Sequence, residues 1–158
     1  MAYVPGLSTI GAEFAYAFEA TAGTKPTAFA KIERCNAIDG ITLENEQIDA
    51  SALEDASTKY VAGRSDPGGT WNVSFNYQDE IQTTLSTLIS DWTTTYKPAG
   101  KALWIEVYHP NLTNGFFVKV EPPSEIPMPS WDQNSLQVLE FPFTIVSYEG
   151  VATAIIPT

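Results

Sequence analysis

The feature that most constrains this chain is a strict alternation of apolar and polar residues in several short segments. In residues 71–77, WNVSFNY, the large apolar side chains Trp71, Val73, Phe75 and Tyr77 fall on one face and small polar ones on the other. Successive side chains of a β-strand point to opposite faces, so this period of two predicts a half-buried strand. A chain patterned in this way must bury one face of a sheet.

Further segments share the strand pattern. Residues 12–20 (AEFAYAFEA) alternate strictly, and residues 101–109 (KALWIEVYH) carry bulky side chains on both faces, as in a strand that is covered on two sides. Pro142 favours an edge position or a bulge in the last predicted strand, because proline lacks the N–H of a sheet ladder. The remaining strands are predicted over residues 28–35, 41–48, 115–121 and 136–148.

One segment has the period of a helix instead. Over residues 79–96 apolar side chains recur three or four positions apart, and Asp79 followed by Gln82 predicts a capping box at the helix start. Pro98 and Gly100 end the element. About seven strands and one flanking helix predict a mainly β fold, a β-sandwich or small barrel, in a single domain over residues 1–158.

Three segments have no core of their own. We predict an N-terminal arm over residues 1–11 and an apolar C-terminal tail over residues 150–158 that needs a surface to pack on. The third is a long polar loop over residues 50–69, which follows Ile48 and Asp49. Loops of this length are uncommon in compact domains and are usually either functional or disordered.

The composition limits the classes of function. Charged residues make up only 17% of the chain, which indicates that a partner covers part of the surface. A net charge of −11 argues against ordinary nucleic-acid binding, which depends on cationic side chains. The opening letters MAYVPGLSTIG lack the pattern of a secretory signal, and no apolar run is long enough to span a bilayer. We therefore expect a soluble, intracellularly made protein with no membrane partner.

The residues for catalysis are scarce. The single histidine, His109, precedes Pro110 at a strand end, where a structural role in a turn is expected, and Cys35 is expected to be a small core or interface residue. One histidine and one cysteine cannot build a structural zinc site. We predict no enzyme activity, no cofactor and no metal. A carbohydrate-binding β-sandwich that uses Trp71, Trp104 and Trp131 is the alternative.

The order of the elements resembles the major tail tube proteins of long-tailed, non-contractile bacteriophages. In this chain the strand end Ile48-Asp49-Ala50-Ser51 is followed by a polar loop, by Tyr60-Val61-Ala62-Gly63, by Asp66-Pro67-Gly68-Gly69 and by the strand WNVSFNY. The likeness covers most of the chain. It departs from the family pattern at Ala50-Ser51, where Val-Thr is usual, and in the expansion Pro67-Gly68-Gly69.

The resemblance implies a structural virion protein. Hexameric rings would stack into a hollow tube that conducts double-stranded DNA, and strands of neighbouring subunits would join into a continuous β-barrel. Its partners would be further copies and other tail proteins, namely the tape measure, tail terminator and distal tail proteins. It would be assembled in the host cytoplasm and located in the virion tail.

The resemblance also implies two sets of site residues. The long loop would contact a neighbouring subunit through Ala50, Ser51, Leu53, Glu54, Asp55, Lys59, Tyr60 and Arg64. Carboxylates that face the lumen would repel DNA phosphates and limit sticking. The candidates lie opposite apolar residues on the early strands, where an outward-facing solvated position is an equally good interpretation; they are Glu13, Glu19, Glu44 and Glu46.

Overall fold

A computed structural model describes residues 6–158. The described chain is mainly β with one helix, α1 (Asp79–Asp91), continued by a π-helical segment, η1 (Trp92–Tyr96). The strands are β1 (Glu13–Phe18), β2 (Ala30–Ile32), β3 (Cys35–Ile38), β4 (Glu44–Asp49), β5 (Tyr60–Asp66), β6 (Thr70–Asn76), β7 (Leu103–Tyr108), β8 (Asn114–Glu121) and β9 (Val138–Thr153). Of the predicted N-terminal arm, residues 1–5 lie outside the described residues, and residues 6–11 form loop and turns.

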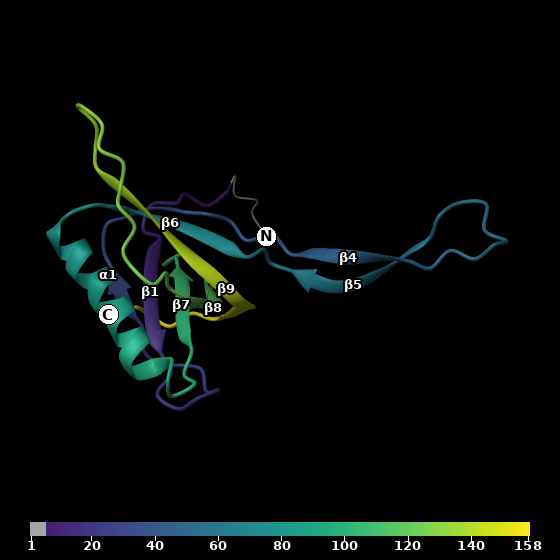
Figure 1. The fold of residues 1–158 in the computed structure, drawn as a ribbon, viewed down its shortest axis with the longest axis horizontal. Helices are drawn as coiled ribbons and strands as arrows, with labels where there is room; N and C mark the ends of the chain where they lie inside the picture. The colour runs from purple at the N-terminus through teal and green to yellow at the C-terminus, as the bar shows by residue number, and fades with distance from the viewer. Residues whose placement is uncertain (1–5) are drawn as a thin grey trace.

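The strands form two separate sheets (Figure 1). Seven of the described strands make an antiparallel sheet in the order β2-β1-β7-β8-β9-β6-β3, and β4 pairs only with β5. The predicted mainly β class with one flanking helix is therefore confirmed. The large sheet is not closed into a barrel within the described chain, because its two edge strands, β2 and β3, do not pair with each other.

The two edges of the large sheet are nevertheless joined by the chain itself. Only Glu33 and Arg34 separate β2 from β3, although β2 pairs with β1 and β3 pairs with β6 at the far side of the sheet. Arg34 makes the bend with a φ of 63°, and its carbonyl accepts a hydrogen bond from the N–H of Asn76 at 2.8 Å. The sheet must therefore curl until its edges approach each other.

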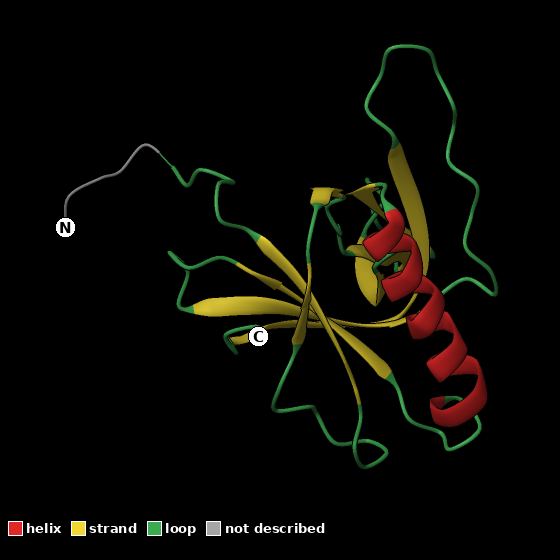
Figure 2. Cartoon of the chain, turned by 90° about the vertical axis from the view of Figure 1, so that its left-hand side faces the viewer, coloured by secondary structure: helices red, strands yellow, loops and turns green. Residues whose placement is uncertain are grey.

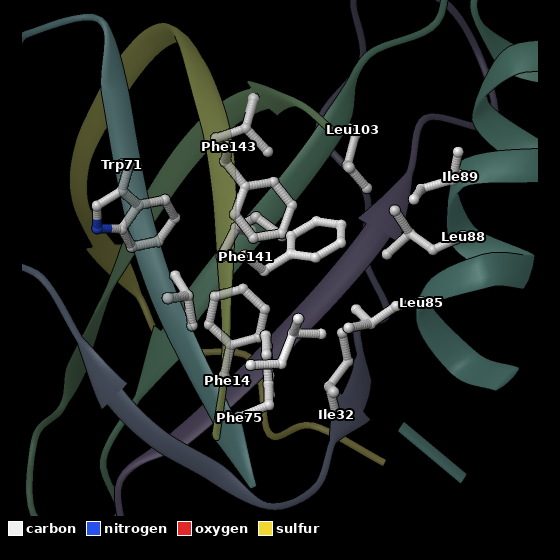
Figure 3. Close-up of a cluster of buried hydrophobic side chains, with 14 of the residues drawn as sticks. Phe14, Ile32, Trp71, Phe75, Leu85, Leu88, Ile89, Leu103, Phe141 and Phe143 are labelled. Carbon is white, nitrogen blue, oxygen red and sulfur yellow. The ribbon is translucent and has the colours of Figure 1, made fainter. Parts of the chain in front are cut away.

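The main hydrophobic core fills the face that the curl encloses (Figure 3). The aromatic rings of Phe14, Phe75, Phe141 and Phe143 meet there, with Phe14 edge-on to Phe75 at a centroid distance of 5.5 Å. Trp71, Val73 and Phe75 are all buried, which confirms the alternation read from β6. Aromatic pairs in such tilted geometries add to the free energy gained from burial alone.

Helix α1 closes one side of the curled sheet (Figure 2). Its buried residues Ile81, Leu85, Leu88 and Ile89 repeat at helical spacing and pack into the main core, as predicted. The predicted capping box is wrong: the N-cap is Gln78, and its side chain makes no capping bond. The acidic residues of the first turn instead lie near the positive end of the helix dipole. Among residues 6–158 no helix combines the length and hydropathy that a membrane crossing requires.

A second, smaller core lies on the opposite face of β1, β7 and β8. It is built from Ala15, Ala17, Phe29, Trp104 and Phe117. β9 extends to Thr153, beyond its predicted end, so the C-terminal tail is shorter than expected. Ile155 of this tail packs against the second core. The tail therefore finds its packing surface within its own chain, which explains why β7 is bulky on both faces.

The long strand β9 changes partner along its length. Residues 138–144 pair with β6, whereas residues 144–153 pair with β8. Pro142 thus lies where β9 has a neighbour on one side only, as its missing N–H predicts.

Substitution of two leucines tests which part of the chain contributes to the free energy of unfolding. Leu85 is 0% exposed in the core, so Leu85→Ala is expected to lower the free energy of unfolding by about 2–5 kcal/mol, through lost contacts and a residual cavity. Leu53 is fully exposed, so the matched control Leu53→Ala should change it by no more than about 0.5 kcal/mol. Urea denaturation followed by circular dichroism measures both. Equal effects of the two substitutions would contradict the assignment of the core.

Candidate assembly site

The most distinctive surface feature is a β-hairpin arm, residues 44–66, that projects from the body of the protein (Figure 1). It contains all eight residues predicted to form the assembly loop. The prediction of a loop over residues 50–69 is wrong in part, because Tyr60–Asp66 forms strand β5 against β4. No apolar alternation marks β5, since neither of its faces is buried and backbone hydrogen bonds alone define it.

The ladder of the arm contains one irregularity. Ile48 of β4 lies opposite Val61 of β5. Between Asn45 and Gln47 the register of the pairing shifts, which marks a bulge in the ladder. Gly63 lies beside this bulge, where a Cβ atom would come within 3.2 Å of both the Cβ and the carbonyl oxygen of Glu46. Glycine therefore permits the close approach of the two strands.

The tip of the arm, residues 50–59, is held by its own hydrogen bonds. The Oδ1 of Asp49 accepts the N–H of Ser51 at 2.9 Å, and Asp55 accepts the N–H of Ala52 at 2.7 Å. These backbone hydrogen bonds lower the pKa of both carboxyl groups. Lys59 completes the tip through a 2.8 Å ion pair with Asp55 and a bond from its own N–H to the Oγ of Ser51. The tip is thus a defined local structure without a core.

The arm presents apolar side chains to solvent. Leu53 at the tip is fully exposed, and Ile48, Tyr60 and Val61 are each more than half exposed. Arg64 and Glu54 are exposed as well. An isolated two-stranded hairpin is marginally stable in water, and its open strand edges can pair with another chain. The arrangement is therefore suited to contact with another protein.

The structure does not bring the four predicted lumen-facing carboxylates together. Glu44 and Glu46 are exposed on the arm, whereas Glu13 lies on β1 of the body and forms a 3.1 Å ion pair with Lys31. The assignment of Glu19 is wrong, because its side chain is 1% exposed. The alternation in residues 12–20 placed Glu13 and Glu19 on the face opposite Phe14, but it did not reveal that a second core covers that face.

Glu19 is held by hydrogen bonds in the second core. Its Oε1 accepts the indole N–H of Trp104 at 2.9 Å, and its Oε2 accepts the backbone N–H of Gly23 at 2.6 Å. Burial alone would raise the pKa of Glu19, but these hydrogen bonds and the charge of Lys119 outweigh it and hold the pKa below its ordinary value. Glu19 therefore fixes the chain that follows β1.

The tryptophans do not form the flat platform that a sugar-binding face requires. Trp71 and Trp104 are buried, and only Trp131 of the three is exposed. Trp131 meets Tyr77 at an interplanar angle of 89°, so the two rings do not share a plane. Met128 and Leu136, in the same proline-rich loop, are exposed as well and were not singled out from the sequence. Residues 122–129, PPSEIPMP, are rich in proline, which indicates an exposed segment because proline lacks the N–H of a sheet ladder.

The contacts of His109 and Cys35 indicate structural roles for both side chains. His109 accepts the N–H of Asn111 at Nδ1 and therefore donates from Nε2 to the carbonyl of Ser8, at 2.8 Å, which fits the predicted structural role. Burial raises the pKa of the Cys35 thiol to about 11, so the nucleophilic thiolate is scarce at neutral pH. No group of three potential ligands for a metal ion occurs within residues 6–158.

An open, mainly apolar hollow of about 630 Å³ lies near the root of the arm. Its lining includes Ile38 at the end of β3, Ile41 from the chain between β3 and β4, and Trp71, Val107 and Val118 from other strands of the large sheet. The hollow therefore lies between the chain from β3 to β4 and the large sheet.

No protein-family model and no curated protein match the chain. Solved structures do share its fold. A chain in the sixfold-symmetrised cryo-EM structure of the anti-feeding prophage baseplate aligns with a TM-score of 0.54 at 15% identity, covering 97% of both chains. A chain in the cryo-EM structure of the anti-feeding prophage cap, the tube-terminating cap, aligns with a TM-score of 0.57 at 12% identity, covering 98% of this chain and 95% of that one. The likeness thus extends over the whole fold.

The lowered pKa of Glu19 predicts how the free energy of unfolding depends on pH. Because its pKa in the folded protein lies below the ordinary value of 4.5, its carboxylate stabilises the fold above that pH, and the stabilisation is lost as the pH falls through the folded pKa. Glu19→Gln is expected to lower the free energy of unfolding at neutral pH by about 1–2 kcal/mol, with the deficit shrinking in acid.

Urea denaturation at a series of pH values measures this effect. The control is Glu121→Gln on the exposed end of β8, which should stay within about 0.5 kcal/mol of the unsubstituted protein. A Glu19→Gln protein as stable at neutral pH as the control would contradict the role of this carboxylate.

Proposed function

We propose that this protein is a structural subunit of a phage-type tail, and that it is the repeating subunit of the tail tube. Hexameric rings stack into a hollow tube that conducts double-stranded DNA. The observation that carries the proposal is the exposed hairpin arm: it has apolar side chains and open strand edges that no other part of residues 6–158 covers. Such an element gains stability only in an assembly.

The shared fold supports the same proposal. The two solved structures described above are parts of the anti-feeding prophage, one from its baseplate and one from the cap that terminates its tube. The baseplate structure was symmetrised sixfold, which agrees with rings of six copies. The tail tube resemblance in the sequence points to the same class of assembly.

Open strand edges on the body suit ring formation. From Val146 to Thr153, β9 pairs with β8 on one side, and among the described residues no strand pairs with its other side. A strand from a neighbouring copy can add there through backbone hydrogen bonds. Contacts in which one surface meets a different surface of the next copy close into a ring when the rotation allows it. The sheets of adjacent subunits would then form the continuous barrel of the tube.

The acidic charge suits the passage of DNA. Each copy carries a net charge of −11, which six copies multiply in every ring. Carboxylates facing the lumen repel phosphates and keep the DNA from binding the wall. Glu13, Glu44 and Glu46 remain our candidates for this surface. The other partners are tail proteins at the ends and inside the tube, namely the tape measure, tail terminator and distal tail proteins. The protein acts in the virion tail, after assembly in the host cytoplasm, without enzymatic activity.

Deletion of the arm tip tests the proposal. Removal of residues 53–59 is expected to leave the fold of the subunit intact, because shortening an exposed loop changes its closure entropy only slightly. It should abolish the formation of rings and tubes, which negative-stain electron microscopy of the concentrated protein detects. Leu53→Asp is expected to weaken assembly in the same direction.

Leu136→Asp is the matched control, since Leu136 is also exposed but lies outside the arm. Its assembly should equal that of the unsubstituted protein. Normal tubes from the protein without residues 53–59 would overturn the role of the arm. A full-length protein that stays monomeric in the presence of tail initiation proteins would overturn the tail tube proposal itself.

A further inference from the structure

The C-terminal residues 154–158, which we name the strap, cover one edge of the large sheet. The N–H of Thr158 donates to the carbonyl of Phe29 at 3.0 Å, and the N–H of Lys31 donates to the carbonyl of Thr158 at 3.0 Å. These bonds occupy the side of β2 that does not face β1. The strap thus blocks a strand edge that is otherwise free to pair.

Little apolar packing holds the strap. Ile155 packs against the second core, but Ile156 is 73% exposed. The N–H of Ala154 donates to the carbonyl of Thr113 at 3.1 Å, and the N–H of Ile155 donates to a carboxylate oxygen of Glu106 at 3.0 Å. Segments with few buried contacts open more easily than the core of a protein.

Among residues 6–158, Glu106 is the single side-chain carboxylate that bonds to the strap. It lies on β7 beside Trp104 and is fully buried. Its Oε1 accepts the Ile155 N–H, whereas its Oε2 is buried without any hydrogen-bond partner. Gly115 of β8 makes room for this group, because a Cβ there would lie 3.0 Å from Oε1. A buried carboxylate with only one of its oxygens satisfied is costly in its charged form.

The charged groups around Glu106 come from two other elements. Lys25, in the chain between β1 and β2, lowers the pKa of Glu106 by its positive charge, and its Nζ lies 3.4 Å from the ring centroid of Phe117. Glu13 of β1 acts in the opposite direction, and it is itself paired with Lys31. Burial is the largest influence and raises the pKa of Glu106. The hydrogen bond from the Ile155 N–H lowers the pKa but does not offset burial, so the pKa is raised overall.

We propose that Glu106 is a pH-sensitive latch for the strap: protonated Glu106 holds residues 154–158 on the sheet, and ionised Glu106 favours their release. Release returns the carboxylate to water and breaks its bond to Ile155. It also exposes the edge of β2 and the part of the second core against which Ile155 packs. The strap therefore controls access to one edge of the sheet.

The direction of the effect follows from linkage. The pKa of Glu106 is raised with the strap bound and returns towards its ordinary value once water reaches the group. The bound state therefore takes up a proton more readily. The stability of the bound state relative to the released state is greatest at low pH and falls as the pH rises through the raised pKa. The equilibrium constant between the two states changes by at most about tenfold per pH unit.

Amide hydrogen exchange of the full chain, followed by NMR, tests the latch. The protection of the Ile155 and Thr158 amides is measured from about pH 4 to about pH 8 relative to a free peptide of the same sequence, which removes the intrinsic pH dependence of exchange. The amide of Val118 in β8 reports whether the body stays folded. We expect strap protection to fall with rising pH while Val118 remains protected.

Two variants assign the effect to Glu106. Glu106→Gln cannot ionise, so its strap protection should be independent of pH, whereas the control Glu140→Gln, at an exposed position of β9, should behave like the unsubstituted protein. Ile155→Pro removes the N–H that bonds to Glu106 and keeps the carboxyl group, so protection of Thr158 should be low at every pH. Strap protection that does not vary with pH, or the same variation in Glu106→Gln, would overturn the latch.

Discussion

The structure depends on one constraint of connectivity: the two edge strands of a seven-stranded sheet are consecutive in the chain and are separated only by Glu33 and Arg34. A flat sheet cannot meet this condition, because β2 and β3 would lie far apart. The sheet curls instead and encloses the aromatic cluster around Phe14, Phe75 and Phe141. Helix α1 covers the side that the curl leaves open, and Phe18 stacks on Tyr96 at a centroid distance of 4.0 Å where the helical segment ends.

The curl also separates the body from the arm. β3 leads into β4, and β5 leads into β6, so the arm continues outward from the pair formed by β3 and β6. The body contains both hydrophobic cores, whereas every residue of β4 is exposed. Under the proposed function, stability and assembly therefore depend on different parts of the chain. We therefore expect substitutions on the arm to alter the proposed contacts between copies without unfolding the subunit.

The second core shows why charge positions were harder to predict than strands. Glu19 follows the alternation of residues 12–20 and Glu106 follows that of β7, so both would be solvated on a sheet with one free face. Both are buried, because the chain after β1 and the C-terminal segment return to cover that face. Glu19 has two hydrogen-bond donors there, whereas Glu106 has one and leaves its second oxygen without a partner. Long-range contacts of this kind leave no local pattern in the sequence.

The sequence by itself determined the elements with a one-sided apolar pattern. The alternation in β1 and β6 and the helical spacing in α1 follow from burial of one face, which any mainly β packing of this chain must satisfy. It also determined the acidic charge and the scarcity of catalytic groups. Only the tertiary structure decided that Tyr60–Asp66 is a strand, that the C-terminal segment seals an edge and that Glu19 is buried. Each of these depends on backbone pairing or on coverage by residues distant in sequence, which are physical contacts that the order of side chains does not encode locally.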